Sequence, residues 1–299
     1  MVQKLPGDIY RSDLKLADGR DISYYDSSEK NRSAADKRNE EAQPGIGHLR
    51  LDPLVDEWVV IASHRQHRVF LPPKELCPLC ASKGDKLTEI PDKDYEVVVF
   101  GNRAPALTTP KGNFKLAQIS ALTTPDVDAA GACEVVCYTS DHSSSFAKLS
   151  EKQIRAVLEA WKDRDSALSK LPFIEQVYIF ENRGEEVGVT LSHPHGQIYA
   201  YSFLPPRIEK MLQVANDHLA KTGKVLLDEV IKREIKDEKR IISQNSEWIA
   251  YVPYAARYPF EIHIAPLRGV SNMSGLDEKQ SAAFAPIAKE VLTRLDGVF

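Results

Sequence analysis

A repeated strand–helix block limits what this chain can fold into more than any other feature of its sequence. Residues 134–138 are a glutamate followed by four apolar residues and lead into residues 149–153 and an amphipathic helical pattern. Residues 261–265 and 276–280 repeat this arrangement, offset by 127 positions, from 134 to 261 and from 149 to 276. Two blocks in one register indicate duplicated modules, each built from a sheet and helices.

The spacing of apolar residues predicts the order of the secondary structure. Strands are predicted at residues 57–62, 95–100, 134–138 and 176–180. Helices are predicted from Ser150, a suitable N-cap, over about 207–219 and less regularly 225–242, and from about Asp277. The order of strands, helix, strands, helices, strands and helix indicates an α+β fold with a largely antiparallel sheet.

We expect three parts along the chain. Residues 1–48 are an N-terminal arm and polar linker, in which a short hairpin precedes a charged stretch, 26–43, that we expect to be solvated. Residues 49–205 are the first module and residues 206–299 the second. A second copy of the histidine-rich stretch described below would fall beyond the last residue, so we expect the second module to be truncated.

Composition excludes several classes of function. The 299 residues, 42% of them hydrophobic, are enough for a sizeable core. Lysine and arginine (39) nearly balance aspartate and glutamate (43), so the net charge of −4 gives no electrostatic basis for binding nucleic acid. The sequence has no run of about 18 apolar residues, and no membrane partner is expected. With four cysteines and no signal peptide, the chain is expected to be soluble and cytoplasmic.

The candidate site centres on residues 192–197, Ser-His-Pro-His-Gly-Gln, which have apolar residues on both sides. In a strand, residues two apart project from the same face, so His193 and His195 can share one site. Pro194 fixes the backbone between them, and Gly196 allows a close approach. The alternative is a strand end with two partly exposed histidines, because short motifs also occur by chance.

Cys77 and Cys80 form a Cys-x-x-Cys pair that needs two further ligands for a tetrahedral zinc site. His142 follows a predicted strand and His193 opens the histidine stretch, so the four residues can make a Cys2His2 set. The alternative is a turn with two buried thiols and two unrelated histidines.

His195 cannot comfortably share a metal with its neighbour, so its imidazole is expected to lie beside the metal site. A neutral imidazole can attack phosphorus and divide a transfer into two displacements through a covalent intermediate. Gln197 offers an amide N–H to developing negative charge without exchanging a proton, which preserves the intermediate until an acceptor arrives. Arg65, Arg68 and Asn182 are candidate phosphate partners, although a solvated basic turn is the simpler explanation of the two arginines.

Four segments, in this order, resemble the galactose-1-phosphate uridylyltransferase family of the histidine-triad superfamily. They are Cys-Pro-Leu-Cys at 77–80, Ser-Asp-His-Ser at 140–143, Phe-Glu-Asn-Arg-Gly at 180–184 and His-Pro-His-Gly-Gln at 193–197. The resemblance implies two fused histidine-triad-like modules and a homodimer. It also implies a ping-pong exchange of UMP between UDP-glucose and galactose 1-phosphate, in the Leloir pathway of galactose metabolism.

The same resemblance implies roles for individual residues. His195 matches the nucleophile that carries the uridylyl group, and Gln197 matches the amide that binds the transferred phosphoryl group. The zinc ligands are matched by Cys77, Cys80, His142 and His193, the phosphate contacts by Arg65, Arg68, Asn182 and Thr190, and the uridine pocket by Phe100 and Asn102. Ser192 and Arg103 depart from the family pattern, which has proline and, in some members, aspartate there.

Two other functions stay open. An adenylyl-transferring phosphorylase of ADP-sugars or dinucleoside polyphosphates shares the same core, so the base pocket decides between it and the uridylyltransferase. A non-catalytic, zinc-stabilised nucleotide-binding module is the third possibility. A histidine-triad hydrolase is disfavoured, because Gln197 stands where those enzymes carry another histidine.

Overall fold

The computed structural model describes residues 2–41, 45–65, 71–110 and 127–298. Its strands are β1 Val2–Leu5, β2 Ile9–Lys15, β3 Asp21–Asp26, β4 His48–Asp52, β5 Glu57–Ile61, β6 Val97–Gly101, β7 Val127–Asp128, β8 Gly131–Cys137, β9 Gln176–Phe180, β10 His195–Tyr201, β11 Ile241–Gln244, β12 Trp248–Tyr251 and β13 His263–Pro266. Its α-helices are α1 Glu151–Leu168, α2 Pro206–Thr222, α3 Leu226–Asp237 and α4 Glu278–Asp296.

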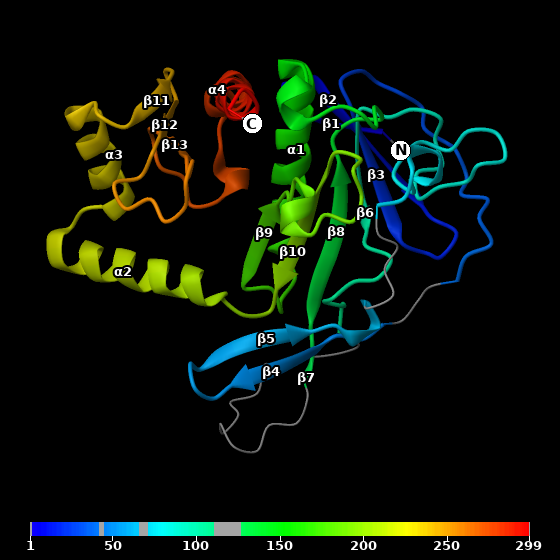
Figure 1. Ribbon diagram of the computed structural model, residues 1–299, viewed down its shortest axis with the longest axis horizontal. Helices are drawn as coiled ribbons and strands as arrows, with labels where there is room; N and C mark the ends of the chain where they lie inside the picture. The colour runs from blue at the N-terminus through cyan, green and yellow to red at the C-terminus, as the bar shows by residue number, and fades with distance from the viewer. Residues whose placement is uncertain (1, 42–44, 66–70, 111–126, 299) are drawn as a thin grey trace.

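Within these residues, seven strands form one antiparallel sheet in the order β1-β2-β3-β6-β8-β10-β9. Two smaller antiparallel sheets have the orders β11-β12-β13 and β5-β4-β7. α1 covers one face of the large sheet, and α4 lies between α1 and the β11–β13 sheet (Figure 1). The expected combination of antiparallel sheets and helices is confirmed.

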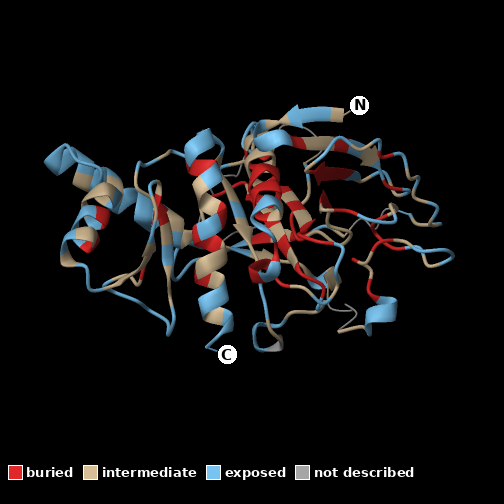
Figure 2. Ribbon diagram, turned by 90° about the horizontal axis from the view of Figure 1, so that it is seen from above, coloured by how far each residue is buried: buried red, intermediate tan, exposed pale blue. Residues whose placement is uncertain are grey.

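The main core lies between α1 and the large sheet. α1 buries Ile154, Val157 and Ala160 against strand residues that include Val136 and Ile198. The helix positions recur every three or four residues, so one stripe of α1 faces the sheet. Figure 2 shows the buried residues concentrated in α1 and the neighbouring strands, whereas α2 has no buried residue. In the described part of the chain, no helix combines the length and the apolar character needed to cross a membrane.

Both helices of the repeated block begin with the same cap. The Ser150 hydroxyl accepts a hydrogen bond from the backbone N–H of Gln153, whose side chain accepts one from the Ser150 N–H. Asp277 and Gln280 form the same reciprocal pair at the start of α4. A capping box satisfies backbone donors that a helix start leaves unpaired, so the repeated residues fix both starts. The predicted helix starts are correct.

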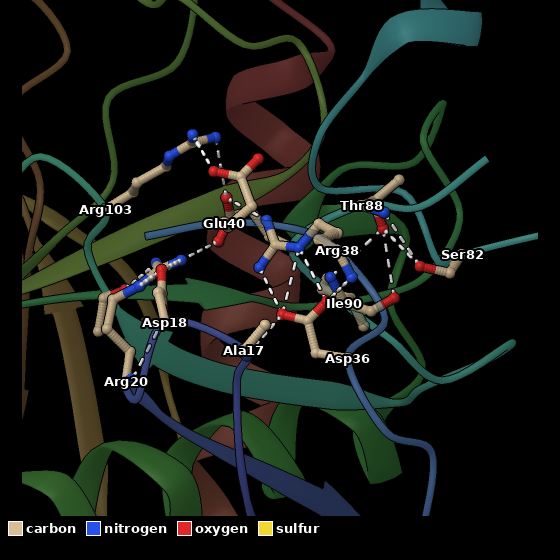
Figure 3. A network of polar contacts seen from close by, with 12 residues as sticks. Ala17, Asp18, Arg20, Asp36, Arg38, Glu40, Ser82, Thr88, Ile90 and Arg103 are labelled. Carbon is tan, nitrogen blue, oxygen red and sulfur yellow. Dashed lines mark hydrogen bonds and ion pairs between the residues drawn. The ribbon is translucent and has the colours of Figure 1, made fainter. Parts of the chain in front are cut away.

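The polar stretch 26–43 has no helix or strand after Asp26 where the structure describes it, and its residues alternate between exposed and partly buried. Arg32 is only 7% exposed, and its guanidinium donates two hydrogen bonds of 2.6 Å to the carboxylate of Asp26. Arg38 donates a 2.7 Å hydrogen bond to Glu89, and Figure 3 shows Arg38 within a larger polar network. Ion pairs rather than apolar contacts attach this partly exposed stretch to the folded chain, which the lack of apolar periodicity does not reveal.

Strands β1 to β3 fall within residues 1–48, which were expected to form an arm. The predicted hairpin is present as β2 and β3, and β3 pairs with β6 from Ile22 opposite Phe100 to Tyr25 opposite Val97. Tyr25 is completely buried. The N-terminal residues therefore belong to the sheet that carries the candidate site.

Candidate active site and metal centre

β10 presents the candidate site residues on one of its two faces. Ile198 and Ala200 are completely buried on the α1 side. His195, Gln197 and Tyr199 alternate with them and therefore project from the opposite face. Because side chains alternate along β10, the candidate catalytic side chains lie on one face of the sheet and the main core lies on the other.

Gly196 lies on the α1 side, where there is no room for a side chain. A Cβ at this position would lie 2.0 Å from the hydroxyl oxygen of Tyr138 and 2.9 Å from the carbonyl oxygen of Phe180. Tyr138 is 1% exposed, so it has little freedom to move away. The expectation of a close approach at Gly196 is confirmed, and the group that approaches is a packed phenol.

Gly196→Ala is therefore expected to lower the free energy of unfolding by about 1–3 kcal/mol, because Tyr138 or β10 must shift. Urea denaturation measures this loss. In a Tyr138→Phe background the same substitution should cost less, because the contacting hydroxyl is gone. An equal loss in both backgrounds would contradict the packing explanation.

His195 has one ring nitrogen engaged and the other available. Its Nδ1 lies 2.7 Å from the backbone carbonyl oxygen of His193. A carbonyl oxygen only accepts, so Nδ1 carries the proton in this hydrogen bond and the lone pair is on Nε2. Burial lowers the pKa of His195, which favours the neutral ring. This is the state in which an imidazole is a nucleophile.

Four predicted metal ligands, Cys77, Cys80, His142 and His193, converge at the start of β10. One ligand atom from each lies within 4.8 Å of the others. The Sγ of Cys80 is 3.4 Å from Nδ1 of His142 and 3.6 Å from Nδ1 of His193. Ligands about 2.0–2.3 Å from a tetrahedral zinc ion lie about 3.3–3.8 Å from one another, so these residues can hold a metal ion.

The imidazole of His193 is oriented by groups on its far side. Its Nε2 is 2.8 Å from the carbonyl oxygen of Thr139 and 2.8 Å from the hydroxyl oxygen of Tyr95, and Nδ1 faces Cys80. Burial lowers the pKa of His193 to about 4 and raises the pKa of Cys77 to about 11. A neutral imidazole is the metal-binding form, and a cation would stabilise thiolates that burial disfavours.

Two residues that support these ligands were not recognised as functional in the sequence. The Oγ of Ser192 is 3.2 Å from Nε2 of His142, yet Ser192 stood out only as a departure from the family pattern. Tyr95 was predicted only as the first residue of the strand at residues 95–100. Its contact with His193 spans 98 positions, so no local signal marks it.

A cleft opens beside His195, between the loop after β9 and the residues before β10. Asn182 lines this cleft together with Glu181, whose pKa burial raises to about 7. Thr190 instead uses its backbone carbonyl to accept a 2.9 Å hydrogen bond from the N–H of Leu71. The structure therefore brings Asn182 to His195, while the side chain of Thr190 is not among the groups that line the cleft.

Arg65 reaches the site face from the turn after β5. Its Nη1 donates a 3.0 Å hydrogen bond to the hydroxyl of Tyr199, and its buried Nε has no partner among the described residues. Because Tyr199 shares a face of β10 with His195, Arg65 belongs to the same surface. Tyr199 was not identified from the sequence. Arg68 lies outside the described residues.

The expected uridine-pocket residues are connected to Gln197 across the sheet. Gln197 pairs with Val135 of β8, and Val135 pairs with Phe100 of β6, so their side chains form one row on the site face. Phe100 is 3% exposed and packs in a cluster with Leu79, which lies between the two cysteines. Asn102 follows β6, and its Oδ1 accepts a 3.0 Å bond from a backbone N–H two residues on.

Fold and site together define a class of protein, a mixed α/β transferase in which an antiparallel sheet carries a neutral histidine beside a Cys2His2 set. Two family models match the chain, described as the N-terminal domain of galactose-1-phosphate uridyl transferase over residues 36–205 and its C-terminal domain over residues 211–299. The chain belongs to the galactose-1-phosphate uridylyltransferase family, which confirms the resemblance seen in the sequence.

Individual relatives agree with this membership. The chain is 42% identical over 291 residues to the galactose-1-phosphate uridylyltransferase of Streptomyces lividans, covering 97% of this chain and 76% of the relative. It is 38% identical over 259 residues to the Thermotoga maritima protein of the same name, covering 84% and 76%. Among solved structures, a uridylyltransferase superposes with a TM-score of 0.68 at 28% identity, covering 81% of this chain and 73% of that one. An ADP-glucose phosphorylase from Arabidopsis thaliana with bound ADP-glucose gives 0.57 at 26% identity, covering 83% and 77%.

Proposed function

We propose that this chain exchanges UMP between UDP-glucose and galactose 1-phosphate by a ping-pong mechanism. The observation that carries the proposal is the His195 ring, whose Nδ1–H is fixed by a carbonyl and whose Nε2 keeps its lone pair beside a cleft. The substrates follow from family membership, because the relatives are named for galactose 1-phosphate and uridylyl transfer.

In the first half-reaction, Nε2 of His195 attacks the α-phosphorus of UDP-glucose. A P–N bond forms while the bond to the bridging oxygen breaks, and glucose 1-phosphate leaves with the electron pair. In the second, a phosphate oxygen of galactose 1-phosphate attacks the same phosphorus, the P–N bond breaks and UDP-galactose is released. Between the two steps the ring is cationic, and the carbonyl of His193 stabilises it by accepting the Nδ1–H.

Other residues of the site face bind phosphoryl oxygens in this proposal. Gln197 is half-buried on the site face of β10, and its side-chain amide can donate to the transferred group. Arg65 and Asn182 add a cation and a second amide, and the resemblance adds Arg68 and Thr190. Because an amide neither gives nor takes a proton, Gln197 cannot act as a general base that activates water against the intermediate.

We further propose zinc as the metal held by Cys77, Cys80, His142 and His193. Four protein ligands close a tetrahedral site, so when bound the ion supplies a crosslink rather than a reacting group. The crosslink would fix His193, whose carbonyl oxygen orients His195. The metal-binding residues would therefore influence His195 by fixing its position rather than by contacting the substrate.

The organisation of the chain is also a proposal. We infer two tandem histidine-triad-like modules that meet at residues 205 and 206, supported by the matching capping boxes of α1 and α4. Strands β1 to β3 belong to the first module, since they pair into its sheet. We also propose a cytoplasmic homodimer. The exposed apolar residues of α2, which are Met211, Leu212, Val214 and Leu219, are of the kind that a subunit contact buries.

Mass spectrometry after brief incubation with UDP-glucose, in parallel with ADP-glucose, tests the proposed reaction. We expect a uridylyl-sized adduct on His195 from UDP-glucose and none from ADP-glucose. An adenylyl adduct would instead assign the chain to the phosphorylases, which the likeness to the ADP-glucose phosphorylase structure makes the second candidate. A folded protein without either adduct would favour a non-catalytic nucleotide-binding module.

A further inference from the structure

Three arginines from separate segments are gathered in one polar network (Figure 3). Arg20 comes from the turn between β2 and β3, Arg38 from the polar stretch and Arg103 from the loop after β6. Their common partner is the carboxylate of Glu89, which is 6% exposed and lies 2.6, 2.7 and 3.8 Å from Arg20, Arg38 and Arg103. Each arginine has a second carboxylate partner: Asp18, Asp36 and Glu40 respectively.

Arg20 is bonded to the backbone of the loop after β6. Its Nη1 donates a 2.7 Å hydrogen bond to the carbonyl oxygen of Gly101, while Nε and Nη2 are bonded to Asp18 and Glu89. With all three nitrogens engaged, the planar guanidinium has a fixed orientation and so fixes the Gly101 carbonyl. Gly101 lies directly between Phe100 and Asn102.

Glu89 is itself attached to the metal-binding turn. Its backbone N–H donates a 3.1 Å hydrogen bond to the carbonyl of Pro78, which lies between the two cysteines of that turn. The neighbouring Thr88 donates from Oγ1 to the carbonyl of Cys80 at 2.6 Å. A continuous path of hydrogen bonds therefore runs from the Cys-x-x-Cys turn through Glu89 and Arg20 to Gly101.

We propose that Arg20 is a positioning residue for the nucleoside pocket, because it holds the Gly101 backbone at a set distance from the metal-binding turn. This inference rests on the proposed function, since it takes Phe100 and Asn102 as the residues that meet the nucleoside. Arg20 precedes residues 36–205, which the family's N-terminal domain matches. The N-terminal hairpin thus contributes to the pocket from outside that domain.

Calorimetric binding of UMP to Arg20→Ala tests the inference. We expect the Kd to rise about tenfold, as the charge-assisted bond to Gly101 is lost. Arg20→Lys keeps a positive charge beside Glu89 but lacks the planar guanidinium group. It should therefore raise the Kd by less than Arg20→Ala does. In turnover, the KM for UDP-glucose should rise and that for galactose 1-phosphate should not, because the second substrate meets an enzyme whose nucleoside is already attached.

Arg32→Ala is the matched control. It removes an arginine that is more deeply buried than Arg20 and that pairs with Asp26 and Asp92 rather than with the loop after β6. It should lower Tm at least as much as Arg20→Ala while leaving the Kd for UMP within about twofold of wild type, a change worth only a few tenths of a kcal/mol.

An unchanged Kd in Arg20→Ala, or an equal rise in Arg32→Ala, would overturn the inference. If Arg20→Ala does not fold, an unchanged Kd in Arg20→Lys would overturn it in the same way. UMP binding requires no transfer, so a wild-type protein that binds UMP without forming an adduct would overturn the proposed function alone. A wild-type protein that does not bind UMP would overturn both.

Discussion

Replacing His195 with alanine is expected to abolish the covalent adduct and to slow uridylyl transfer at least about a thousandfold, because alanine has no lone pair to attack phosphorus. The wild-type ring is prepared for this step by two features that alanine cannot reproduce. The hydrogen bond to the His193 carbonyl selects the tautomer, and burial lowers the pKa of the ring and keeps it neutral. Mass spectrometry measures the adduct, and release of glucose 1-phosphate measures transfer.

The variant must still bind nucleotide for this result to be interpreted as a loss of chemistry. We expect His195→Ala to bind UMP with nearly wild-type affinity, since the residue is replaced without disturbing the Gly196 packing. His263→Ala is the control, because His263 is exposed on the β13 strand of a different sheet and lies 3.1 Å from Glu261. A persistent adduct in His195→Ala, or its loss in His263→Ala, would refute the role of His195.

The features that could be predicted from the sequence are those that depend on neighbouring residues. The alternation along β10 and the helix starts at Ser150 and Asp277 involve contacts within four positions, so a single window of sequence contains the whole signal. The Cys77 and Cys80 pair is equally local. His142 joined the predicted set because it follows a strand end and can supply one of the two missing ligands, and the structure brings it to the cysteines.

The partners that could not be predicted are three tyrosines whose roles arise from tertiary contacts. Tyr95 contacts His193, Tyr138 packs beneath Gly196, and Tyr199 accepts a hydrogen bond from Arg65. In a strand pattern each tyrosine counts as one more apolar residue. Which way its hydroxyl points is decided by the pairing of strands, and that information is absent from any short window.

The second large effect is expected from Cys80→Ser, which should remove bound zinc and lower the free energy of unfolding by about 3 kcal/mol or more. The Sγ of Cys80 lies 3.4 Å and 3.6 Å from the two imidazoles, so replacing it removes a ligand that contacts both histidines. A loss of this size lowers Tm by about 6–12 °C in a domain of 150–250 residues. Zinc content per chain and thermal unfolding measure the two effects.

Cys133→Ser separates metal loss from thiol loss, because Cys133 is a buried cysteine outside the cluster. We expect the Cys133→Ser variant to keep its zinc and to lose only the part of the free energy of unfolding that comes from packing of the buried thiol. Cys80→Ser should in addition form the His195 adduct more slowly at temperatures where it is still folded, since His193 would be less firmly fixed and its carbonyl orients the nucleophile. Equal zinc content in the wild type and Cys80→Ser would refute the metal site. Metal loss with an unchanged adduct rate would show instead that Thr139 and Tyr95 alone are enough to hold His193 in place.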